Sequence, residues 1–315
     1  MRMRAFGVAT AAAFALVVAC KAGPRPFPDP DAPAASPVRV AFVPPERTPI
    51  VERLSTTRVE GGDGGTETQT VHATLTSTFE RSDDGWILTQ RLSDVRAERR
   101  GAEVDSPFLA LMTRFPIKLR LATDGAFVRL ANPEDAEAAI LATFPDPQQA
   151  AVVLRYLTPD AIEKQAKLEW NGKYGDLLGR DVLPGHAWYA WEVVPLADGA
   201  ELGYVLERKV TETRASDAGR ELVIALGCPT TPEAAANSMA MRTLLESRDE
   251  PTLEKTLVCA GEQVIGLDPF VPRSMRLELT AAPKDPSGAE RRLALTRTMR
   301  TQDHSGVGVL KQEVR

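Results

Sequence analysis

Apolar and polar residues alternate along much of the chain after residue 50. In residues 71–80, "VHATLTSTFE", one face of an extended segment carries the apolar residues Val71, Ala73, Leu75 and Phe79. Successive side chains of a β-strand point to opposite faces, so this period of two predicts a half-buried strand. The turn sequence "SDDG" leads into "WILTQRLSDVRAE", which predicts a hairpin. A second hairpin is predicted in "IKLRLATDGAFVRL", with its turn at Asp124-Gly125.

Three helices are predicted after these hairpins. Asn132-Pro133, Asp146-Pro147 and Thr158-Pro159 each join a capping residue to a proline suited to the first helical turn. Apolar residues recur there at spacings of three and four, at Ala150, Val153, Leu154 and Leu157. This spacing predicts one buried stripe on a helix.

Strands are predicted again from His186, in "HAWYAWEVVPLADGAELGYVLERKVTET" and "RELVIALGC". Thr231-Pro232 begins a further helix to about Ser247, and the alternating segments "SMRLELTA" and "RRLALTRTMR" follow. This order predicts an α+β fold, predominantly antiparallel β-hairpins with a helical middle segment. We expect two regions, 46–180 and 181–315, with a single wrapped sheet as the alternative.

The first 19 residues are ordered like a secretory signal peptide. Arg2 and Arg4 precede an apolar run of 15 residues. This run is shorter than the roughly 20 residues that a membrane-spanning helix needs. The residues Val17-Val18-Ala19-Cys20 then resemble the lipobox of bacterial lipoproteins.

The lipobox resemblance implies acylation of the Cys20 thiol, cleavage before it and acylation of the new amino terminus, with fatty acids such as palmitate as the membrane anchor. In Gram-negative lipoprotein sorting, an aspartate after the cysteine favours the inner membrane. This chain has Lys21, which favours the outer membrane. The alternative is cleavage after a nearby alanine and release of a secreted protein.

Residues 20–45 are interpreted as the lipidated cysteine and a proline-rich tether. Six prolines lie between Pro24 and Pro37, and Phe27 is almost the only large apolar residue there. Such a segment buries too little surface to fold, and its prolines keep it extended. The alternative is an ordered arm that docks on the folded domain.

Charge argues against nucleic acid as a partner. Removal of residues 1–19 lowers the number of basic residues from 38 to 36, against 43 acidic residues, which gives a formal charge of −7. Proteins that neutralise many phosphates concentrate basic residues on one surface. The basic residues of this chain are instead dispersed among acidic ones. The expected partners are therefore a membrane, through the lipid on Cys20, and a protein or an apolar ligand.

Candidate chemistry is sparse in this sequence. Cys228 and Cys259 flank the helix predicted from residue 232, and an oxidising compartment favours a disulfide between them; two separate buried thiols are the alternative. His72, His186 and His304 lack the spacing of a zinc site, so we expect no metal or other cofactor. The chain also lacks the GxSxG motif of a serine hydrolase, and no catalytic residue is predicted.

Three tryptophans cluster around residue 180 and are candidates for lining a ligand groove: Trp170, Trp188 and Trp191. Aromatic residues at strand starts are also common in cores, so a core role is the alternative. The sequence favours a non-enzymatic envelope lipoprotein with a structural or partner-binding role. A periplasmic carrier of lipid or another apolar ligand is the second hypothesis, and an enzyme is the third.

The overall plan resembles a family of uncharacterised bacterial lipoproteins that combine a lipobox, a proline-rich tether and an antiparallel β-rich body. The segments that carry this resemblance are "WILTQRLSDVRAE", "LRLATDGAFVRL" and "DVLPGHAWYAW". The resemblance implies a β-rich fold in the cell envelope and no particular activity.

The lipobox generates the first testable prediction. Cys20→Ala removes the acylation site, so we expect the protein to move from the membrane fraction to the soluble fraction. Each buried methylene of an acyl chain contributes about 0.8 kcal/mol to membrane binding, and this contribution is lost. Fractionation followed by detergent-free washing measures the change. Retention of the variant in the membrane fraction contradicts the lipid anchor and supports an uncleaved helix.

Overall fold

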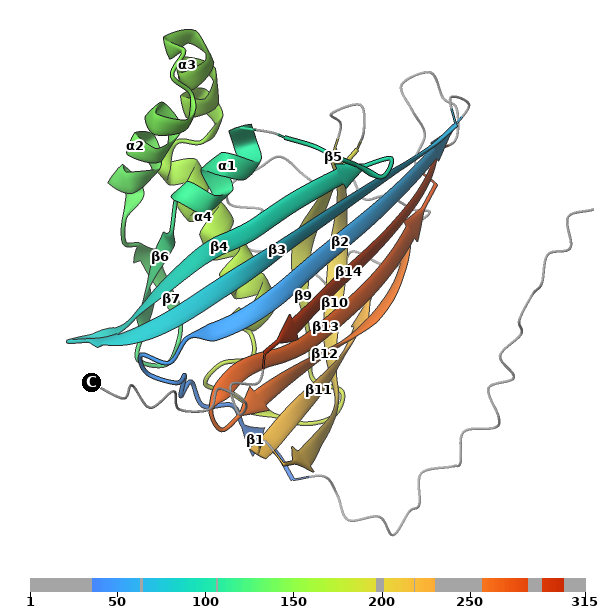
Figure 1. Ribbon diagram of the computed structural model, residues 1–315. Coiled ribbons are helices and arrows are strands. Elements are labelled where there is room, and N and C mark those ends of the chain that lie inside the picture. The colour runs from blue at the N-terminus through green and yellow to red at the C-terminus, as the bar shows by residue number, and fades with distance from the viewer. Residues whose placement is uncertain are drawn as a thin grey trace, which may run out of the picture. The chain divides into compact units, whose positions relative to one another are not determined.

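The computed structural model describes residues 36–62, 65–105, 107–196, 201–217, 219–229, 257–282 and 291–302. One compact unit spans Ser36–Arg315 (Figure 1). The signal peptide, Cys20, His304 and the helix predicted from Thr231 to Ser247 lie outside the described residues.

One long antiparallel sheet dominates this unit (Figure 1). Its strands, in chain order, are β2 (Ile50–Gly62), β3 (Gly65–Ser82), β4 (Gly85–Arg99), β5 (Ala102–Glu103), β6 (Ile117–Ala122), β7 (Phe127–Leu130), β9 (Ala187–Pro195), β10 (Glu201–Ser216), β11 (Gly219–Gly227), β12 (Val258–Leu267), β13 (Phe270–Ala281) and β14 (Arg292–Thr301). Across the sheet the order is β7-β6-β4-β3-β2-β14-β13-β12-β11-β10-β9, and β5 pairs with β4. A separate pair joins β1 (Val38–Arg39) to β8 (Asp181–Val182). The predicted class, a mainly antiparallel β body with a few helices, is confirmed.

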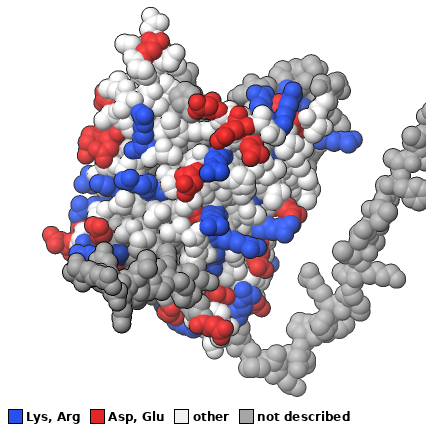
Figure 2. All heavy atoms as spheres, viewed as in Figure 1, with Lys and Arg blue, Asp and Glu red and all other residues white. Residues whose placement is uncertain are grey.

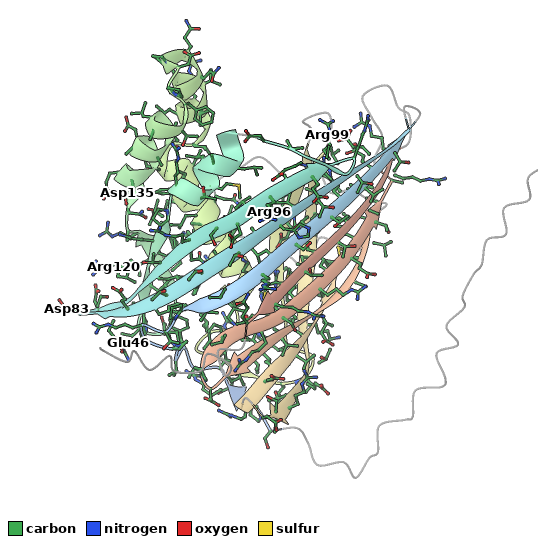
Figure 3. The ribbon with its side chains drawn as sticks, viewed as in Figure 1. Glu46, Asp83, Arg96, Arg99, Arg120 and Asp135 are labelled. Carbon is green, nitrogen blue, oxygen red and sulfur yellow. A yellow bond between two sulfur atoms is a disulfide. The ribbon has the colours of Figure 1, made fainter. Side chains whose placement is uncertain are left out.

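The hairpins predicted from alternation are present. Strands β3 and β4 pair from Ser82 and Gly85 at the turn to Gln69 and Arg99 at the far end. Figure 3 shows this length, with Asp83 at one end of the hairpin and Arg99 toward the other. Because the strands are so long, one hairpin spans most of the folded unit.

The β6–β7 turn uses Gly125 as predicted, with a φ of 87°. This left-handed conformation favours glycine. A Cβ atom at Gly125 would also lie 2.6 Å from a ring carbon of Phe42. The turn therefore needs glycine for its backbone conformation and for its packing.

All three proline-initiated helices are confirmed: α2 (Pro133–Thr143), α3 (Pro147–Tyr156) and α4 (Pro159–Trp170). The side chains of Asp146 and Thr158 accept hydrogen bonds from backbone N–H groups of α3 and α4, as N-caps do. Asn132 does not cap α2; its side chain instead accepts a hydrogen bond from the backbone N–H of Lys118 at 2.9 Å. Two elements were not predicted from the sequence: a short helix, α1 (Pro107–Arg114), and a π-helical turn, η1 (Asn171–Gly175), that continues α4.

The boundary expected near residue 180 does not separate two domains. Strand β14, from the second predicted region, pairs with β2 of the first region over ten residue pairs, from Glu52↔Thr301 to Gly61↔Arg292. Residues on both sides of position 180 thus build one sheet, which was the alternative in the sequence analysis.

Helix α4 contacts both edge strands of the curled sheet. It contacts β7 at one edge and, together with η1, β9 at the other. The Glu163 carboxylate accepts a hydrogen bond from the backbone N–H of Leu130 in β7 at 3.1 Å. The main hydrophobic core fills the space inside the curl and includes Leu88, Leu121, Leu177, Leu206, Ile224 and Leu279.

The expected tether is too long at its C-terminal end. Residues 38–45 belong to the folded unit: Val40 is fully buried, and its N–H donates to the Arg180 carbonyl at 2.9 Å. Phe42 packs edge-on against four aromatic rings, those of Phe79, Trp86, Trp170 and Phe270. Residues 38–45 are therefore part of the folded unit and not of the tether. Residues 20–35 lie outside the described residues.

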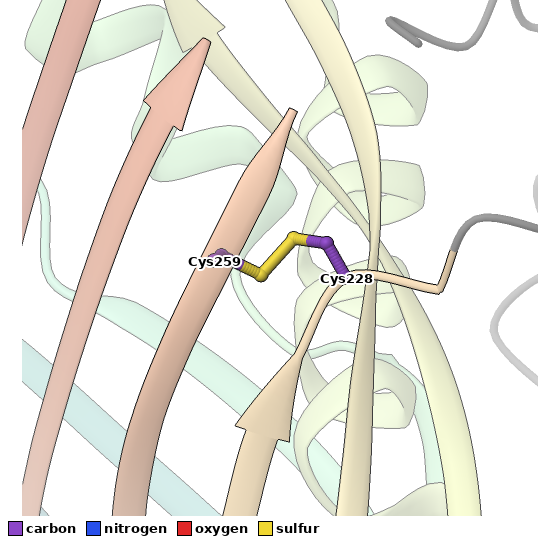
Figure 4. Close-up of a disulfide and its surroundings, with 2 residues drawn as sticks. All are labelled: Cys228 and Cys259. Atoms are coloured by element: carbon purple, nitrogen blue, oxygen red, sulfur yellow. A yellow bond between two sulfur atoms is a disulfide. The ribbon is translucent and has the colours of Figure 1, made fainter. Parts of the chain in front are cut away.

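A disulfide joins Cys228 to Cys259, with their Cα atoms 5.3 Å apart (Figure 4). It links the residue after β11 to β12, next to the end of their pairing at Gly227↔Ala260. The intervening chain is thereby closed into a loop, which contributes roughly 3–4 kcal/mol to stability by the chain-entropy estimate.

The viewed surface carries charges of both signs. Figure 2 shows Lys and Arg side chains interspersed with Asp and Glu over this face. Some charged side chains form ion pairs: Arg120 of β6 pairs with Asp84 in the β3–β4 turn, and Arg99 of β4 pairs with Glu67 of β3. Exposed pairs of this kind contribute little to stability, and their alternation matches the dispersed charge of the sequence.

The packing of Phe42 generates the second prediction. Phe42→Ala should destabilise the protein by about 3–5 kcal/mol, because it leaves a cavity among four aromatic rings. Val43→Ala is the control, because the neighbouring Val43 is 55% exposed. Urea unfolding measures both variants. Equal stabilities would show that this segment does not pack on the sheet.

Candidate functional site

A cavity of about 510 Å³ lies between α4, η1 and the curled sheet. Strands β9 and β10 form one wall, and β2, β13 and β14 form another. Its size is within the usual range for small-molecule sites, about 300–1,000 Å³.

The helical wall presents polar residues at regular spacing. Gln165, Glu169 and Lys173 recur every fourth residue, line the cavity and are exposed. The Gln165 amide donates to the Glu169 carboxylate at 2.9 Å. Leu168 and Gly172 line the cavity from the adjacent row. The exposed row forms the rim of the cavity, and the second row forms part of its wall.

The three candidate groove tryptophans have different roles. Trp170 and Trp188 are buried in the core, where their indole N–H groups donate to the carbonyls of Gly125 at 2.9 Å and Gly172 at 3.1 Å. These bonds join α4 and η1 to the sheet. Trp191 lines the cavity. A Cβ at Gly203 would lie 2.1 Å from its indole, so the ring lies directly over this glycine.

A charge network crosses the cavity. Glu192 of β9 accepts a hydrogen bond from Arg297 of β14 at 2.9 Å and faces Arg208 of β10 at 3.5 Å. Arg297 also donates to the Val193 carbonyl at 3.4 Å. Since β9 and β14 are not neighbours in the sheet, this network joins the edge strand to the middle of the sheet across its concave face.

The network keeps its carboxylate ionised. Burial acts to raise the pKa of Glu192, but the positive charges of Arg208, Arg297 and Lys173 outweigh burial. The pKa of Glu192 therefore lies below its ordinary value of 4.5. A carboxylate held in this way acts as a fixed negative charge at neutral pH.

Arg208 is the least satisfied member of the network. It is 2% exposed, and its Nε and Nη1 atoms have no hydrogen-bond partner among the described residues. The indole N–H of Trp191 and the hydroxyl of Tyr204 are also buried without such a partner. Buried donors without acceptors are costly, so Arg208, which lines the cavity, favours a guest that supplies acceptors.

A second buried carboxylate lies near the cavity. Glu52 of β2 is 7% exposed, and burial raises the pKa of its carboxyl although Lys173 acts to lower it. The same burial, with the nearby charge of Glu52, raises the pKa of Tyr174. Glu52 is therefore a polar group whose ionisation costs the folded state free energy.

The remaining candidate residues do not converge on this cavity. His72 is exposed on β3, and His186 contacts the Asp176 carbonyl at 3.1 Å. Among the described residues, no three His, Cys, Asp or Glu side chains are placed to hold a metal ion. Nor does any helix in the described ranges have the length and apolar character to cross a membrane.

Sequence reasoning missed the charged residues of the cavity. Glu192 stands between the inward residues Ala190 and Val194, and Arg208 between Leu206 and Val210. A charge at an inward position of an alternating strand is the signal that identifies both.

No known protein family matches the chain, and no curated protein matches it. Among solved structures, it is similar to lipovitellin with a TM-score of 0.42 and 6% identity, covering 82% of this chain and 25% of that one. It is also similar to an outer membrane lipoprotein-sorting protein domain from Vibrio parahaemolyticus, with a TM-score of 0.19, 8% identity and coverages of 82% and 87%. An exported protein from Bacteroides fragilis has a TM-score of 0.19, 9% identity and coverages of 84% and 100%. At such low scores these neighbours carry no argument about function.

The burial of Glu52 generates the third prediction. Because the pKa of Glu52 is raised in the fold, the folded state holds its proton more tightly than the unfolded chain, and stability falls as pH rises above about 4.5. Glu52→Gln has no carboxyl group to ionise, so it removes this loss of stability at higher pH. We expect the variant to gain stability over the wild type at a pH of about 8 and to lose that advantage at about 4.

Urea unfolding at the two pH values measures this difference. Glu80→Gln is the control, because Glu80 is exposed on β3. A stability difference between Glu52→Gln and the wild type that does not change with pH contradicts the raised pKa.

Proposed function

We propose that this protein is a lipid-anchored protein of the bacterial cell envelope that binds a small, largely apolar ligand in the cavity beneath α4. The observation that carries the proposal is the cavity of about 510 Å³ with its mixed lining. Predominantly apolar walls with a few placed polar groups are typical of small-molecule sites.

The apolar part of the lining comes from several strands and from α4. It includes Leu54, Leu168, Trp191, Leu206, Leu277 and Met299. Burial of apolar ligand surface against such a wall contributes roughly 25 cal/mol per Å². The same site does not favour catalysis by Glu192, because two arginines hold its carboxylate ionised and leave it unsuited to proton transfer near neutral pH.

Attachment to the envelope rests on the N-terminal sequence. The lipobox at Val17–Cys20 supports acylation of Cys20, and the proline-rich residues that follow support a spacer that ends before Val38. An anchored protein with a ligand cavity is suited to holding or transferring a molecule close to a membrane. Lys21 supports the outer membrane as the location.

A partner-binding role is the second candidate. Met112, Leu141 and Val152, from α1, α2 and α3, are 46%, 51% and 53% exposed. These helices share a small core separate from the main one, built around Leu111, Ile140 and Phe144. The three exposed side chains, on helices that share this core, are the candidate contact residues for a protein partner.

The cavity generates the fourth prediction. The neutral fluorescent probe N-phenylnaphthylamine should bind the purified protein saturably in detergent-free buffer. Ala190→Phe places a phenyl ring in the cavity wall and should weaken binding by about tenfold or more, which corresponds to about 1.4 kcal/mol of lost apolar contact. Fluorescence titration measures both affinities.

Ala294→Phe is the matched control, because Ala294 is exposed on β14 and does not line the cavity. Circular dichroism checks that both variants are folded. If the wild type shows no saturable binding, or if both variants bind as tightly as the wild type, ligand binding in this cavity is contradicted.

A further inference from the structure

We propose that the ligand is an amphipathic anion, an apolar body with one acidic headgroup, and that Arg208 binds the headgroup. This inference rests on the proposed function and adds the chemical class of the ligand. It follows from the charge of the cavity, from the unsatisfied donors of Arg208 and from the apolar residues beside that arginine.

The charge of the lining is positive. Lys173 and Glu169 lie on the exposed rim and compensate each other. In the interior, Arg208 and Arg297 face one carboxylate, Glu192. Two guanidinium groups and one carboxylate leave one positive charge. A ligand with a single negative charge neutralises the interior, whereas a cation adds to its charge.

Hydrogen bonding distinguishes the two arginines. Arg297 donates to Glu192 at 2.9 Å and to the Val193 carbonyl at 3.4 Å. Arg208 has one contact at 3.5 Å, and two of its nitrogens lack partners within the described residues. A guanidinium presents its donors in a planar fork that matches carboxylate, sulfonate or phosphate oxygens. Arg208 is therefore the residue placed to receive an acidic group.

Apolar residues continue from Arg208 along the same wall. Leu206 lies two positions before it, on the same face of β10, and Ala190 is the pairing partner of Leu206 on β9. Leu277 and Met299 form the facing wall. A headgroup at Arg208 thus leaves the ligand body among apolar side chains, which is the arrangement that an amphipathic molecule requires.

Two probes with the same aromatic skeleton separate the contribution of ligand charge to affinity from the contribution of the apolar body. Anilinonaphthalenesulfonate has the skeleton of N-phenylnaphthylamine with an added sulfonate. We expect the wild type to bind the sulfonate probe more tightly than the neutral probe. Arg208→Met should weaken binding of the sulfonate probe by about tenfold or more, because the charge-assisted hydrogen bonds from the guanidinium to the sulfonate are lost. The same variant should change the affinity for the neutral probe by less than about twofold.

Arg300→Met is the matched control. It removes the same charge from β14 at an exposed position that does not line this cavity. Its affinities for both probes should equal those of the wild type. If Arg300→Met weakens binding of the sulfonate probe as much as Arg208→Met does, the effect comes from the overall charge of the protein and the proposal is overturned.

Glu192→Gln gives a test that does not depend on the folding of Arg208→Met. It removes the carboxylate between the two arginines. The affinity for the sulfonate probe should therefore rise by about 3-fold or more, and the affinity for the neutral probe should not change. An unchanged or weakened affinity of Glu192→Gln for the sulfonate probe overturns the assignment of the headgroup site.

The outcomes separate the two proposals. Failure of both probes to bind contradicts ligand binding in the cavity altogether. A second outcome is that the neutral probe binds, the sulfonate probe binds no more tightly, and Arg208→Met has no effect. This outcome leaves ligand binding in the cavity intact and overturns the proposal that the ligand has an anionic headgroup. Inorganic phosphate is the last probe: if it displaces the sulfonate at millimolar concentration while the neutral probe does not bind, the site takes simple anions and the amphipathic ligand is contradicted.

Discussion

The apolar face of one long antiparallel sheet must be removed from water, and this constraint shapes the whole folded unit. The sheet meets it by curling until β9 comes within reach of β14, while α4 contacts both edge strands. Burial of the enclosed side chains drives the curl, since burial of apolar surface is the main favourable contribution to folding. The two tryptophan N–H bonds and the Glu163 bond then fix α4 in place.

This closure leaves a cavity, and its contents support the proposal that it binds a ligand. Complete apolar packing would be more stable than a buried ion pair with unsatisfied donors. The chain instead places Glu192, Arg208 and Arg297 against leucine and methionine side chains. Uncompensated charge beside an apolar wall is a feature of binding sites, because a bound ligand can supply both hydrogen-bond acceptors and apolar contacts.

Local structure could be predicted from the sequence, but long-range pairing could not. Alternation located the hairpins, and the three X-Pro pairs located α2, α3 and α4, because strand period and helix capping depend on neighbouring residues. The single sheet was only the alternative prediction, because the pairing of β2 with β14 joins the two ends of the unit.

The end of the tether was placed too late because Phe42 is an isolated aromatic in its own segment, and its four ring partners come from distant elements. The cavity was suggested by Trp191 alone, since the partners of Arg208 and Glu192 are set by the curl.

A double-mutant cycle on Glu192 and Arg297 tests most directly whether the curled sheet is tied across its concave face. The two residues are 105 positions apart, and their contact exists only if β9 reaches β14. Urea unfolding of Glu192→Gln, Arg297→Gln and the double variant should give a coupling free energy of about 1–3 kcal/mol, the range for residues in one ion-pair network. Additive effects, with a coupling free energy of about zero, would show that the edge strand is not joined to β14 and would contradict the network across the cavity.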